Sequence, residues 1–334
     1  MIMIKQTMTS PFSGGDAKLC YEPSVLTFRK EQFHYVHQFY ECQETHERFT
    51  TTELDEANLA QVYNQYRAKY GIPFPEEIKR IRMHYGLSAT KMSEILGFGE
   101  NQYRLYENGE MPSEANGKVL MSIMNPEIFR IFVDNARGQF SDEEFAKLLE
   151  KAESWKLKKY SQVVIDYVFG NVRRDINNGY TALSISKLKN ILLYFIEKGH
   201  GVYITKMNKL LFYTDFLSYR ECGKGMTGLK YKAIQYGPVP VRWDRIYSFY
   251  DEINQEIVQL TNEREGTMLV SKLSPVMSDF NDDELEILRT VHQRFEKESP
   301  TQISDTSHQE EAWKKYFNTD LPISFGMAFT LKAI

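Results

Sequence analysis

Hydrophobic and polar positions change their period along the chain, and the change predicts two kinds of element. Before about Thr52 the sequence is β-rich. Over 27–40, aromatic and β-branched residues partly alternate with polar ones, as in a half-buried strand pair. After Thr52, apolar residues recur at 59, 62, 63 and 66, which is helical spacing. Gly and Pro residues over 71–75 then interrupt this helix.

Several short helices are predicted between Pro75 and Ala136. Pro75 suits the first position of a helix that Gly86 ends. Ser88 is placed to cap the next helix, which Gly97 ends. Further helices are expected over 101–107, 113–124 and 126–135. The residues expected on the buried faces are Ile78, Ile81, Tyr85, Met92, Ile95, Leu96, Tyr103 and Tyr106.

Downstream, the pattern predicts a boundary near 137–139 and then mostly helix. Ser141 and Glu144 form a capping box, so a helix should start at 141 or 142 and run towards Lys159. The basic residues expected near its C-terminal end are Lys151, Lys156, Lys158 and Lys159. The later helices are expected at 184–198, 205–219, 240–254, 281–298 and 308–317. The β-prone stretches are 229–234 and 268–273.

These elements predict a mainly α fold with a small N-terminal β element, in the α+β class. The first domain, 1–70, combines the β element with a helix. The second, 71–137, is a bundle of short helices, and 138–175 is a helical linker. The last domain, 176–334, is α-rich with a short β-hairpin.

Composition narrows the class of protein. The chain has 334 residues, with 41 Lys and Arg against 45 Asp and Glu, which gives a net charge of −4. A surface that binds nucleic acid everywhere is therefore not expected. Apolar runs are far shorter than the roughly 20 residues that span a bilayer, so no membrane partner is expected. Only three cysteines occur, and with no visible secretory signal we expect a cytoplasmic protein.

Two short helices joined by a Gly-containing turn suggest a helix-turn-helix at 88–107. The residues expected to face DNA bases are Glu100, Asn101, Gln102 and Arg104. The residues expected at flanking phosphates are Lys79, Arg80, Arg82, His84 and Lys91. Between Pro73 and Arg137, eight Lys and Arg face nine Asp and Glu, a net charge of −1. A helical domain that does not bind DNA is therefore an equal alternative.

The run 87–109, which ends in Tyr106-Glu107-Asn108-Gly109, resembles the helix-turn-helix of MqsA-type antitoxins of the YgiT group. The resemblance implies base reading by an Asn near the start of the second helix and by an Arg directly before Tyr-Glu. Asn101 matches the first. Leu105 occupies the second position and Arg104 lies one residue earlier, which turns its side chain by about 100° around the helix.

The same family opens with a zinc ribbon built on two Cys-x-x-Cys knuckles. In this chain Ser10 and Ser13 occupy the first knuckle, and Cys42 and Thr45 occupy the second. Structural zinc needs four nitrogen or sulfur ligands, so we predict no metal and no cofactor. The alternative ligands would be His34, His37 and His46. Without zinc, the sheet should be held by the aromatic residues Phe28, Phe33, Tyr35, Phe39 and Tyr40.

Three motifs of the C-terminal domain, taken in order, resemble the Panacea domain of SocA-like antitoxins. They are the helix opening 206–215, the turn 234–240 and the segment 306–313. The resemblance implies direct binding of a partner toxin. Interface energy is concentrated in aromatic side chains. The hydroxyls of Tyr213 and Tyr236 favour partly exposed positions for both residues. The expected partner-binding residues are Lys209, Tyr213, Tyr219, Tyr236, Gly237 and Pro238.

These resemblances imply an antitoxin of a type II toxin-antitoxin system, which neutralises its cognate toxin by direct binding and represses the shared promoter by binding operator DNA. A homodimer is compatible with such an operator. The alternative is a transcriptional regulator or proteolytic adaptor that binds a non-toxin host protein. Metalloprotease, nucleophile-elbow and phosphate-loop motifs are missing from the sequence, so we do not expect an enzyme or catalytic residues.

Overall fold

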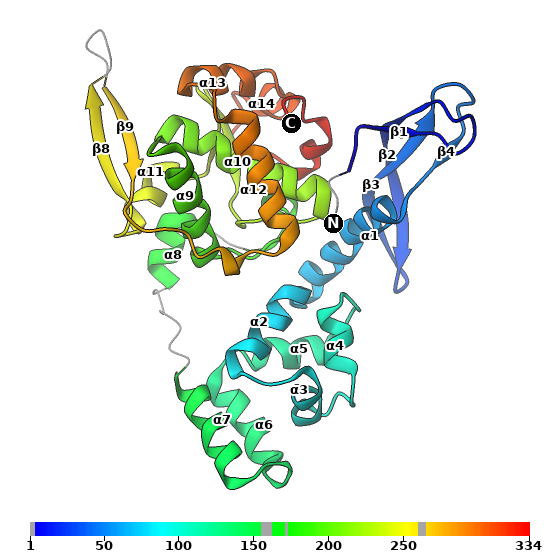
Figure 1. Cartoon of the computed structure of the whole chain (residues 1–334), viewed down its shortest axis with the longest axis vertical. Coiled ribbons are helices and arrows are strands. Elements are labelled where there is room, and N and C mark those ends of the chain that lie inside the picture. The colour runs from blue at the N-terminus through cyan, green and yellow to red at the C-terminus, as the bar shows by residue number, and fades with distance from the viewer. Residues whose placement is uncertain (1–3, 155–161, 171–172, 260–264) are drawn as a thin grey trace. The chain divides into compact units, whose positions relative to one another are not determined.

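The computed structural model (Figure 1) describes residues 4–154, 162–170, 173–259 and 265–334. It divides into two compact units. The first unit joins Met1–Val62 to Gln162–Ile334, and the second unit is Tyr63–Ser161. Helices predominate and a small antiparallel sheet lies near the N-terminus, which confirms the predicted fold class. Among the described residues, no helix is both long and apolar enough to cross a membrane.

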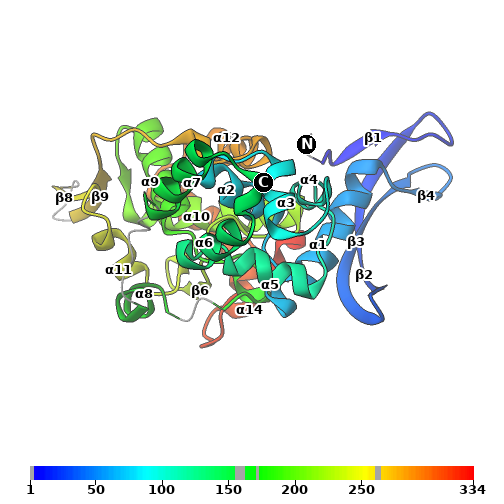
Figure 2. The same cartoon turned by 90° about the horizontal axis from the view of Figure 1, so that it is seen from below.

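The N-terminal sheet is a long hairpin with a short strand on each side (Figure 2). β2 (Asp16–Phe28) and β3 (Glu31–Cys42) pair along their length, from Ala17 opposite Cys42 to Phe28 opposite Glu31. β1 (Thr7–Thr9) and β4 (Arg48–Phe49) flank them at the end away from the turn. The sequence placed a strand pair within 27–40. The turn at residues 29 and 30 instead assigns most of that stretch to β3 alone.

Helix α1 (Thr52–Tyr70) follows the sheet and covers an edge of β3. The side-chain amide of Asn58 both accepts from and donates to the backbone of Gln38, at 2.9 and 3.0 Å. Gln61 makes the same two bonds to Val36, at 3.0 and 2.9 Å. Two helix amides therefore replace the backbone of a neighbouring strand, and they fix the start of α1 to the sheet.

The N-terminal sheet and α1 also contact the C-terminal part of the first unit. Gln38 donates its side-chain amide to the carbonyl of Arg220 at 3.4 Å. The backbone N–H of Ile4 donates to the carboxylate of Glu221 at 3.0 Å. Gly223 has φ +67°, and a Cβ there would lie 2.7 Å from the backbone nitrogen of Gln61. Residues 1–62 are therefore part of the C-terminal unit, whereas the sequence predicted a separate domain at 1–70.

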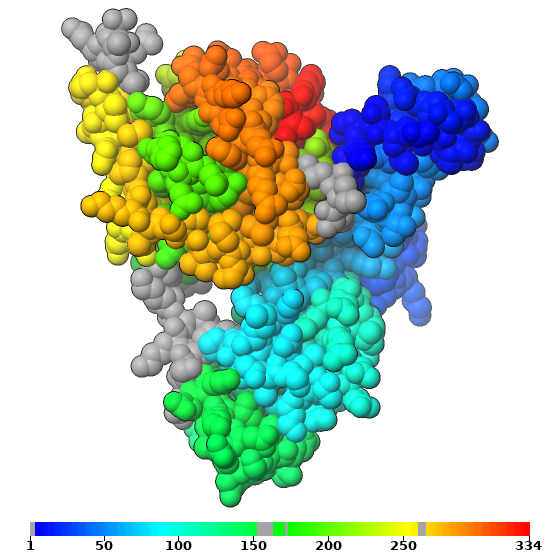
Figure 3. Space-filling model, in the orientation of Figure 1, coloured from blue at the N-terminus to red at the C-terminus, as the bar shows by residue number. Residues whose placement is uncertain are grey.

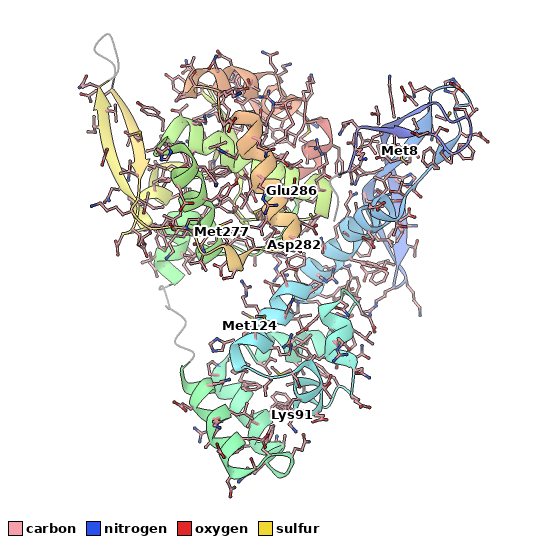
Figure 4. The ribbon with its side chains drawn as sticks, in the orientation of Figure 1. Met8, Lys91, Met124, Met277, Asp282 and Glu286 are labelled. Carbon is pink, nitrogen blue, oxygen red and sulfur yellow. The ribbon has the colours of Figure 1, made fainter. Side chains whose placement is uncertain are left out.

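α10 (Ile204–Cys222) is the central helix of this C-terminal part and is buried nearly all round. Its neighbours are α9 (Ile185–Gly199), α12 (Asp282–Phe295), α13 (Pro300–His308) and η5 (Phe325–Thr330). Figure 3 shows α12, in orange, on the visible surface, and its first turns carry Asp282 and Glu286 in Figure 4. The shorter helices are α8 (Gln162–Phe169), η2 (Ile176–Asn178), α11 (Trp243–Ile246), η3 (Tyr247–Phe249), η4 (Met277–Asp279) and α14 (Glu311–Tyr316).

Short strands complete the C-terminal part. β6 (Tyr231–Ile234) and β7 (Gly237–Pro240) form a hairpin. A second sheet has the order β5-β9-β8, and Figures 1 and 2 both show β8 and β9 side by side. The strands of this sheet are β5 (Val202–Tyr203), β8 (Asn254–Gln259) and β9 (Glu265–Val270).

The predicted helix over 240–254 is wrong. Arg242 has φ +63°, a left-handed conformation that cannot lie inside an α-helix. Only the single turns of α11 and η3 follow it. Asn254 then starts β8, where it pairs with Val270. The pairing partner lies in a later part of the chain, so the local pattern of 240–254 did not reveal the strand.

A buried carboxylate attaches the β6–β7 hairpin to α10. Asp215 accepts hydrogen bonds from the N–H groups of Met226 and Thr227, at 2.7 and 2.8 Å. The hydroxyls of Thr227 and Tyr231 also donate to it, each at 2.5 Å. Burial raises the pKa of Asp215, and these four hydrogen bonds oppose that shift. The start of the hairpin is thereby fixed against the middle of α10.

The second unit is a bundle of short helices around an aromatic core. The predicted buried residues from Ile78 to Tyr106 all belong to this core, and the ring centroids of Tyr85 and Phe129 are 3.6 Å apart. The helices are α2 (Pro75–Tyr85), α3 (Ala89–Leu96), α4 (Gln102–Glu107), α5 (Glu114–Ser122), α6 (Pro126–Asn135), η1 (Arg137–Gln139) and α7 (Asp142–Ser154).

The predicted linker 138–175 does not form a single connecting segment. The capping box of Ser141 and Glu144 is present and starts α7 as predicted. However, Phe140 and Leu148 are buried in the core of the second unit, whereas α8 belongs to the first unit. The predicted basic end of this helix at Lys156, Lys158 and Lys159 lies outside the described residues.

Replacing Asp215 with leucine should destabilise the first unit. Two backbone N–H groups and two hydroxyls would lose their buried acceptor, and each unsatisfied group costs free energy. We expect the free energy of unfolding to fall by roughly 3–5 kcal/mol. Urea-induced unfolding of the full chain measures this change. The exposed Asp251→Leu is the control, and an equal loss in both variants would contradict the assigned role.

Candidate functional site

Three segments of the first unit meet beside the β6–β7 hairpin. α10 contacts both β7 and α13, and α13 contacts β7. They carry the three motifs by which the sequence resembles the Panacea domain, although about 100 residues of chain separate the first motif from the last. We call this meeting point the Lys209 site. Its members are Lys209 of α10, Gly237 of the hairpin, Ser307 and His308 of α13, and Trp313 of α14.

Lys209 is fully buried, with an exposed fraction of 0%. Its Nζ has no hydrogen-bond partner among the described residues. A buried ammonium is costly without a partner, and burial accordingly lowers the pKa of Lys209 to about 7. The amine is therefore held partly neutral at neutral pH, in contrast to an ordinary lysine.

Gly237 brings the backbone of the hairpin directly over the Lys209 side chain. It has φ +98°, which favours glycine. A Cβ at this position would lie 2.4 Å from the Ser307 hydroxyl and 2.6 Å from Cε of Lys209. The Tyr-Gly-Pro motif therefore requires glycine for two reasons: the backbone conformation and the close approach of two side chains.

Side chains of α13 and α14 hold the hairpin from the other side. Ser304 donates its hydroxyl to the carbonyl of Tyr236 at 2.8 Å, and Trp313 donates Nε1 to the carbonyl of Ile234 at 2.8 Å. The rings of His308 and Trp313 are 4.2 Å apart. Burial and the charge of Lys209 lower the pKa of His308, although a hydrogen bond to the backbone of Gln235 opposes them. Nε2 of His308 has no partner among the described atoms.

A buried carboxylate near the site is already occupied by other donors. Glu310 accepts from the hydroxyl of Tyr213 at 3.2 Å and from the backbone N–H groups of Lys332 and Ala333, at 2.9 and 3.0 Å. Burial raises the pKa of Glu310. Glu310 therefore holds the 332–333 segment against α10, and it forms no ion pair with Lys209.

Most of the predicted partner-binding residues are not on the surface. The expectation that Tyr213 is partly exposed is wrong, because its exposed fraction is 0% and its hydroxyl bonds to Glu310. The helix that carries it is enclosed by other elements, so a hydroxyl does not bring the ring to the surface. The other buried members of the predicted set are Lys209, Tyr219, Gly237 and Pro238. Tyr236, at the tip of the hairpin, is 64% exposed.

Sequence reasoning missed Ser304 and Glu310, although a signal for the first was present. The hydrophobic pattern predicts a helix over 308–317, which leaves Ser304 outside it. Ser299 followed by Pro300, with Gln302 three residues after the serine, is a helix start. With that start, Ser304 lies one turn before His308 on the same face. Glu310 had no comparable signal, because its partners are contributed by residues 213 and 332–333.

In the second unit, α3 and α4 form the predicted helix pair. The buried hydroxyl of Ser93 accepts from the N–H of Tyr103 at 2.8 Å, which fixes the start of α4 against α3. Tyr103 in turn donates its hydroxyl to the carbonyl of Ile78 at 2.8 Å. On the outer surface of α4 and the turn before it, Glu100, Asn101 and Arg104 are exposed. The side-chain amide of Gln102 donates to Glu110 at 2.9 Å.

The predicted phosphate-contacting residues divide into two groups. Lys79 and Arg80 are exposed on α2. Lys91, labelled on α3 in Figure 4, donates to Glu94 and to the carbonyl of Gln139, each at 3.2 Å.

The prediction that Arg82 contacts a phosphate is corrected, because its guanidinium is hydrogen-bonded to other residues of the second unit. It binds Glu107 through two bonds of 2.5 and 2.9 Å and also donates to the carbonyl of Leu87. Bidentate pairs of this kind fix geometry. We therefore assign Arg82 to the packing of α2 against α4 and not to a phosphate.

The four predicted knuckle positions of the N-terminal sheet meet at one point. The hydroxyl of Ser13 lies 3.3 Å from Sγ of Cys42, and the N–H of Thr45 donates to the same sulfur at 3.5 Å. Hydrogen bonds from Ser10, Ser13 and Thr45 lower the pKa of Cys42 to about 6. In the described part of the chain, no three His, Cys, Asp or Glu side chains are grouped to hold a metal ion.

The predicted aromatic cluster of the sheet is divided between two faces. Tyr40 packs with Phe49 at a ring distance of 5.6 Å and belongs to a small core with Ala17 and Leu54. Phe39 lies beside His37 at 5.4 Å. Successive residues of a strand point to opposite faces, so residues 39 and 40 cannot share one cluster.

Replacing Lys209 with methionine should stabilise the protein. Methionine has nearly the same length and carries no charge, so we expect the free energy of unfolding near pH 7 to rise by roughly 1–4 kcal/mol. The pKa of Lys209 is lower in the folded protein than in the unfolded chain, so wild-type stability should increase as the pH rises from about 7 towards 10.5. The advantage of methionine should therefore shrink over this range, as thermal unfolding at several pH values would show.

Lys187 is a matched control for this substitution. It is also buried, but its Nζ binds Glu284 at 2.7 Å. Lys187→Met leaves that carboxylate unpaired and should lower stability by roughly 3–5 kcal/mol. A loss of stability in Lys209→Met as large as that in Lys187→Met would contradict the absence of a partner for Lys209.

Comparison with known proteins identifies one segment of the chain. A family model described as "Antitoxin SocA-like, Panacea domain" matches residues 207–314. Searches of curated proteins and of solved structures found no match. The matched segment contains every member of the Lys209 site and lies within the predicted domain 176–334. Residues 207–314 are thus similar to the SocA-like Panacea domain, which suggests an antitoxin role.

Proposed function

We propose that this protein is an antitoxin that neutralises a cognate toxin by binding it directly through the C-terminal part of the first unit. The observation that supports this proposal is the family match over 207–314. The Lys209 site adds to it, because three segments that resemble that family meet there around an amine that has no partner among the described residues. A residue that lowers stability without a structural partner is typical of a functional site.

The tip of the β6–β7 hairpin is our candidate for the toxin-binding surface. Tyr236 is 64% exposed and directly precedes Gly237 of the Lys209 site. Tyrosine contributes large contact areas at interfaces at a small cost in side-chain entropy. Ser304 and Trp313 hold the backbone of the hairpin by hydrogen bonds, so the position of Tyr236 is defined before a partner binds.

Tyr236→Ala should weaken neutralisation, because it removes an exposed aromatic anchor while the buried members of the site remain. We expect full-length protein to rescue growth of bacteria that co-express the toxin gene adjacent to its own gene. The variant should rescue less well, with toxin affinity reduced by roughly thirtyfold. Tyr167→Ala is the matched control, because Tyr167 is 62% exposed on α8 and should not affect rescue.

Failure of intact, folded wild-type protein to rescue growth would reject neutralisation of that toxin. It would favour the alternative of a regulator or adaptor that binds a non-toxin host protein. The full chain is needed in this assay, because residues 1–62 contribute contacts to the end of α10.

We further propose that α3 and α4 form a helix-turn-helix that binds operator DNA and represses the promoter of the gene pair. The support is the fixed α3–α4 pair with exposed Asn101 and Arg104, which carry the side-chain types that read adenine and guanine edges. One unit of nearly balanced charge offers few phosphate contacts, so a homodimer on a palindromic operator fits this proposal.

Joint replacement of Asn101 and Arg104 by alanine should abolish the shift of promoter DNA in a gel at moderate salt. Both side chains are exposed, so the variant should fold and should still rescue growth. The control is Arg130→Ala on α6, outside the α3–α4 pair, which should leave the shift intact. An unchanged shift in the double variant would reject the assignment of α4 as the reading helix.

A further inference from the structure

The Lys209 site contains an amine for which the described residues provide no counter-charge. The buried amine of Lys187 shows the usual arrangement, because it binds Glu284 at 2.7 Å. Lys209 is more deeply buried, with 0% of its surface exposed against 9% for Lys187. Its Nζ nevertheless has no partner among the described atoms.

The buried carboxylates of the surrounding elements do not fill this role. Asp215, on the same helix, is saturated by four donors from residues 226–231. Glu310, between α13 and α14, accepts three hydrogen bonds from residues 213, 332 and 333. Both acids are held in place by these bonds, so neither is an acceptor for Lys209, and Nζ has no other acceptor in the part of the chain that the structure describes.

A second nitrogen without a partner lies in the same site. Nε2 of His308 is buried and has no hydrogen-bond partner among the described atoms. Burial lowers the pKa of the ring, and the charge of Lys209 lowers it further. The ring is fixed by its contact with Trp313 and by the hydrogen bond to the backbone of Gln235. When protonated, both nitrogens are hydrogen-bond donors, and neither has an acceptor among the described residues.

We propose that the Lys209 site binds the carboxylate of an aspartate or glutamate side chain of a partner protein, with Lys209 Nζ and His308 Nε2 as the donors. This inference rests on the proposed function, in which the partner is the toxin. An incoming anion would favour protonation of both nitrogens, so that each donates one hydrogen bond to it.

The geometry favours a small planar anion over a phosphate. A Cβ at Gly237 would be only 3.2 Å from Nζ and 2.4 Å from the Ser307 hydroxyl, so the space above the amine is narrow. Entry requires a displacement of the hairpin tip, where Tyr236 is exposed, against the hydrogen bonds from Ser304 and Trp313 to the carbonyls of Tyr236 and Ile234. The buried amine is then reached beside the proposed toxin-binding surface.

Acetate is a probe for this site that does not require the partner. In the full-length protein, sodium acetate should raise the melting temperature more than sodium chloride of equal ionic strength. It should also raise the pKa of His308, measured from its ring resonances by NMR. Lys209→Met should weaken acetate binding by roughly thirtyfold or more. Lys232→Met is the control, because Lys232 is exposed on the same hairpin and should leave acetate binding unchanged.

The outcomes separate this inference from the proposed function. If sodium phosphate acts and acetate does not, the site takes a different anion and the carboxylate assignment fails. If neither salt raises the melting temperature more than chloride does, the site is not an anion receptor. The same conclusion follows if acetate still raises the melting temperature of Lys209→Met. Growth rescue by wild-type protein without any acetate effect would reject this inference alone. An acetate effect without growth rescue would instead reject the toxin as the partner.

Discussion

The arrangement of the C-terminal part depends on the buried carboxylate of Asp215. Its four donors come from the segment that leads into β6, so a single side chain of α10 fixes where the β6–β7 hairpin begins. The carboxylate is costly to bury, and the cost is offset because every donor is itself buried and needs an acceptor. The hairpin then extends along α10 until Gly237 lies over Lys209. Lys209 precedes Asp215 in α10 by less than two helical turns.

Two buried lysines of the first unit differ in whether their amines are paired with a carboxylate. Lys187 is neutralised by Glu284, and the pair is part of the packing between α9 and α12. Lys209 is enclosed by a glycine backbone, a serine and a histidine, and none of these carries a negative charge. The resulting low pKa is a consequence of burial alone. An apolar residue at this position would make the protein more stable. The presence of a lysine there therefore favours a role in binding.

In the N-terminal sheet, the four predicted knuckle positions lie together, although only one of them is a cysteine. Ser10, Ser13, Cys42 and Thr45 meet at the predicted knuckle positions, but hydroxyls surround one sulfur there. The sheet is instead held by amide side chains of α1 along β3 and by contacts with the end of α10. These contacts explain why residues 1–62 join the C-terminal part in one compact unit.

The sequence alone determined the features that depend on local chemistry. Caps, glycine stops and helical spacing placed α2 to α7 well, because each signal involves residues within a few positions of one another. Through the resemblance to a family, it also identified Lys209, Gly237 and the segment 306–313, which contains His308, without indicating that they meet. Tertiary structure decided which predicted residues are exposed and paired Arg82 with Glu107. It also reduced the predicted helix 240–254 to the single turns α11 and η3, with β8 starting at Asn254. The physical reason is that burial, strand pairing and ion pairing depend on partners distant in sequence, and only the folded chain brings those partners together.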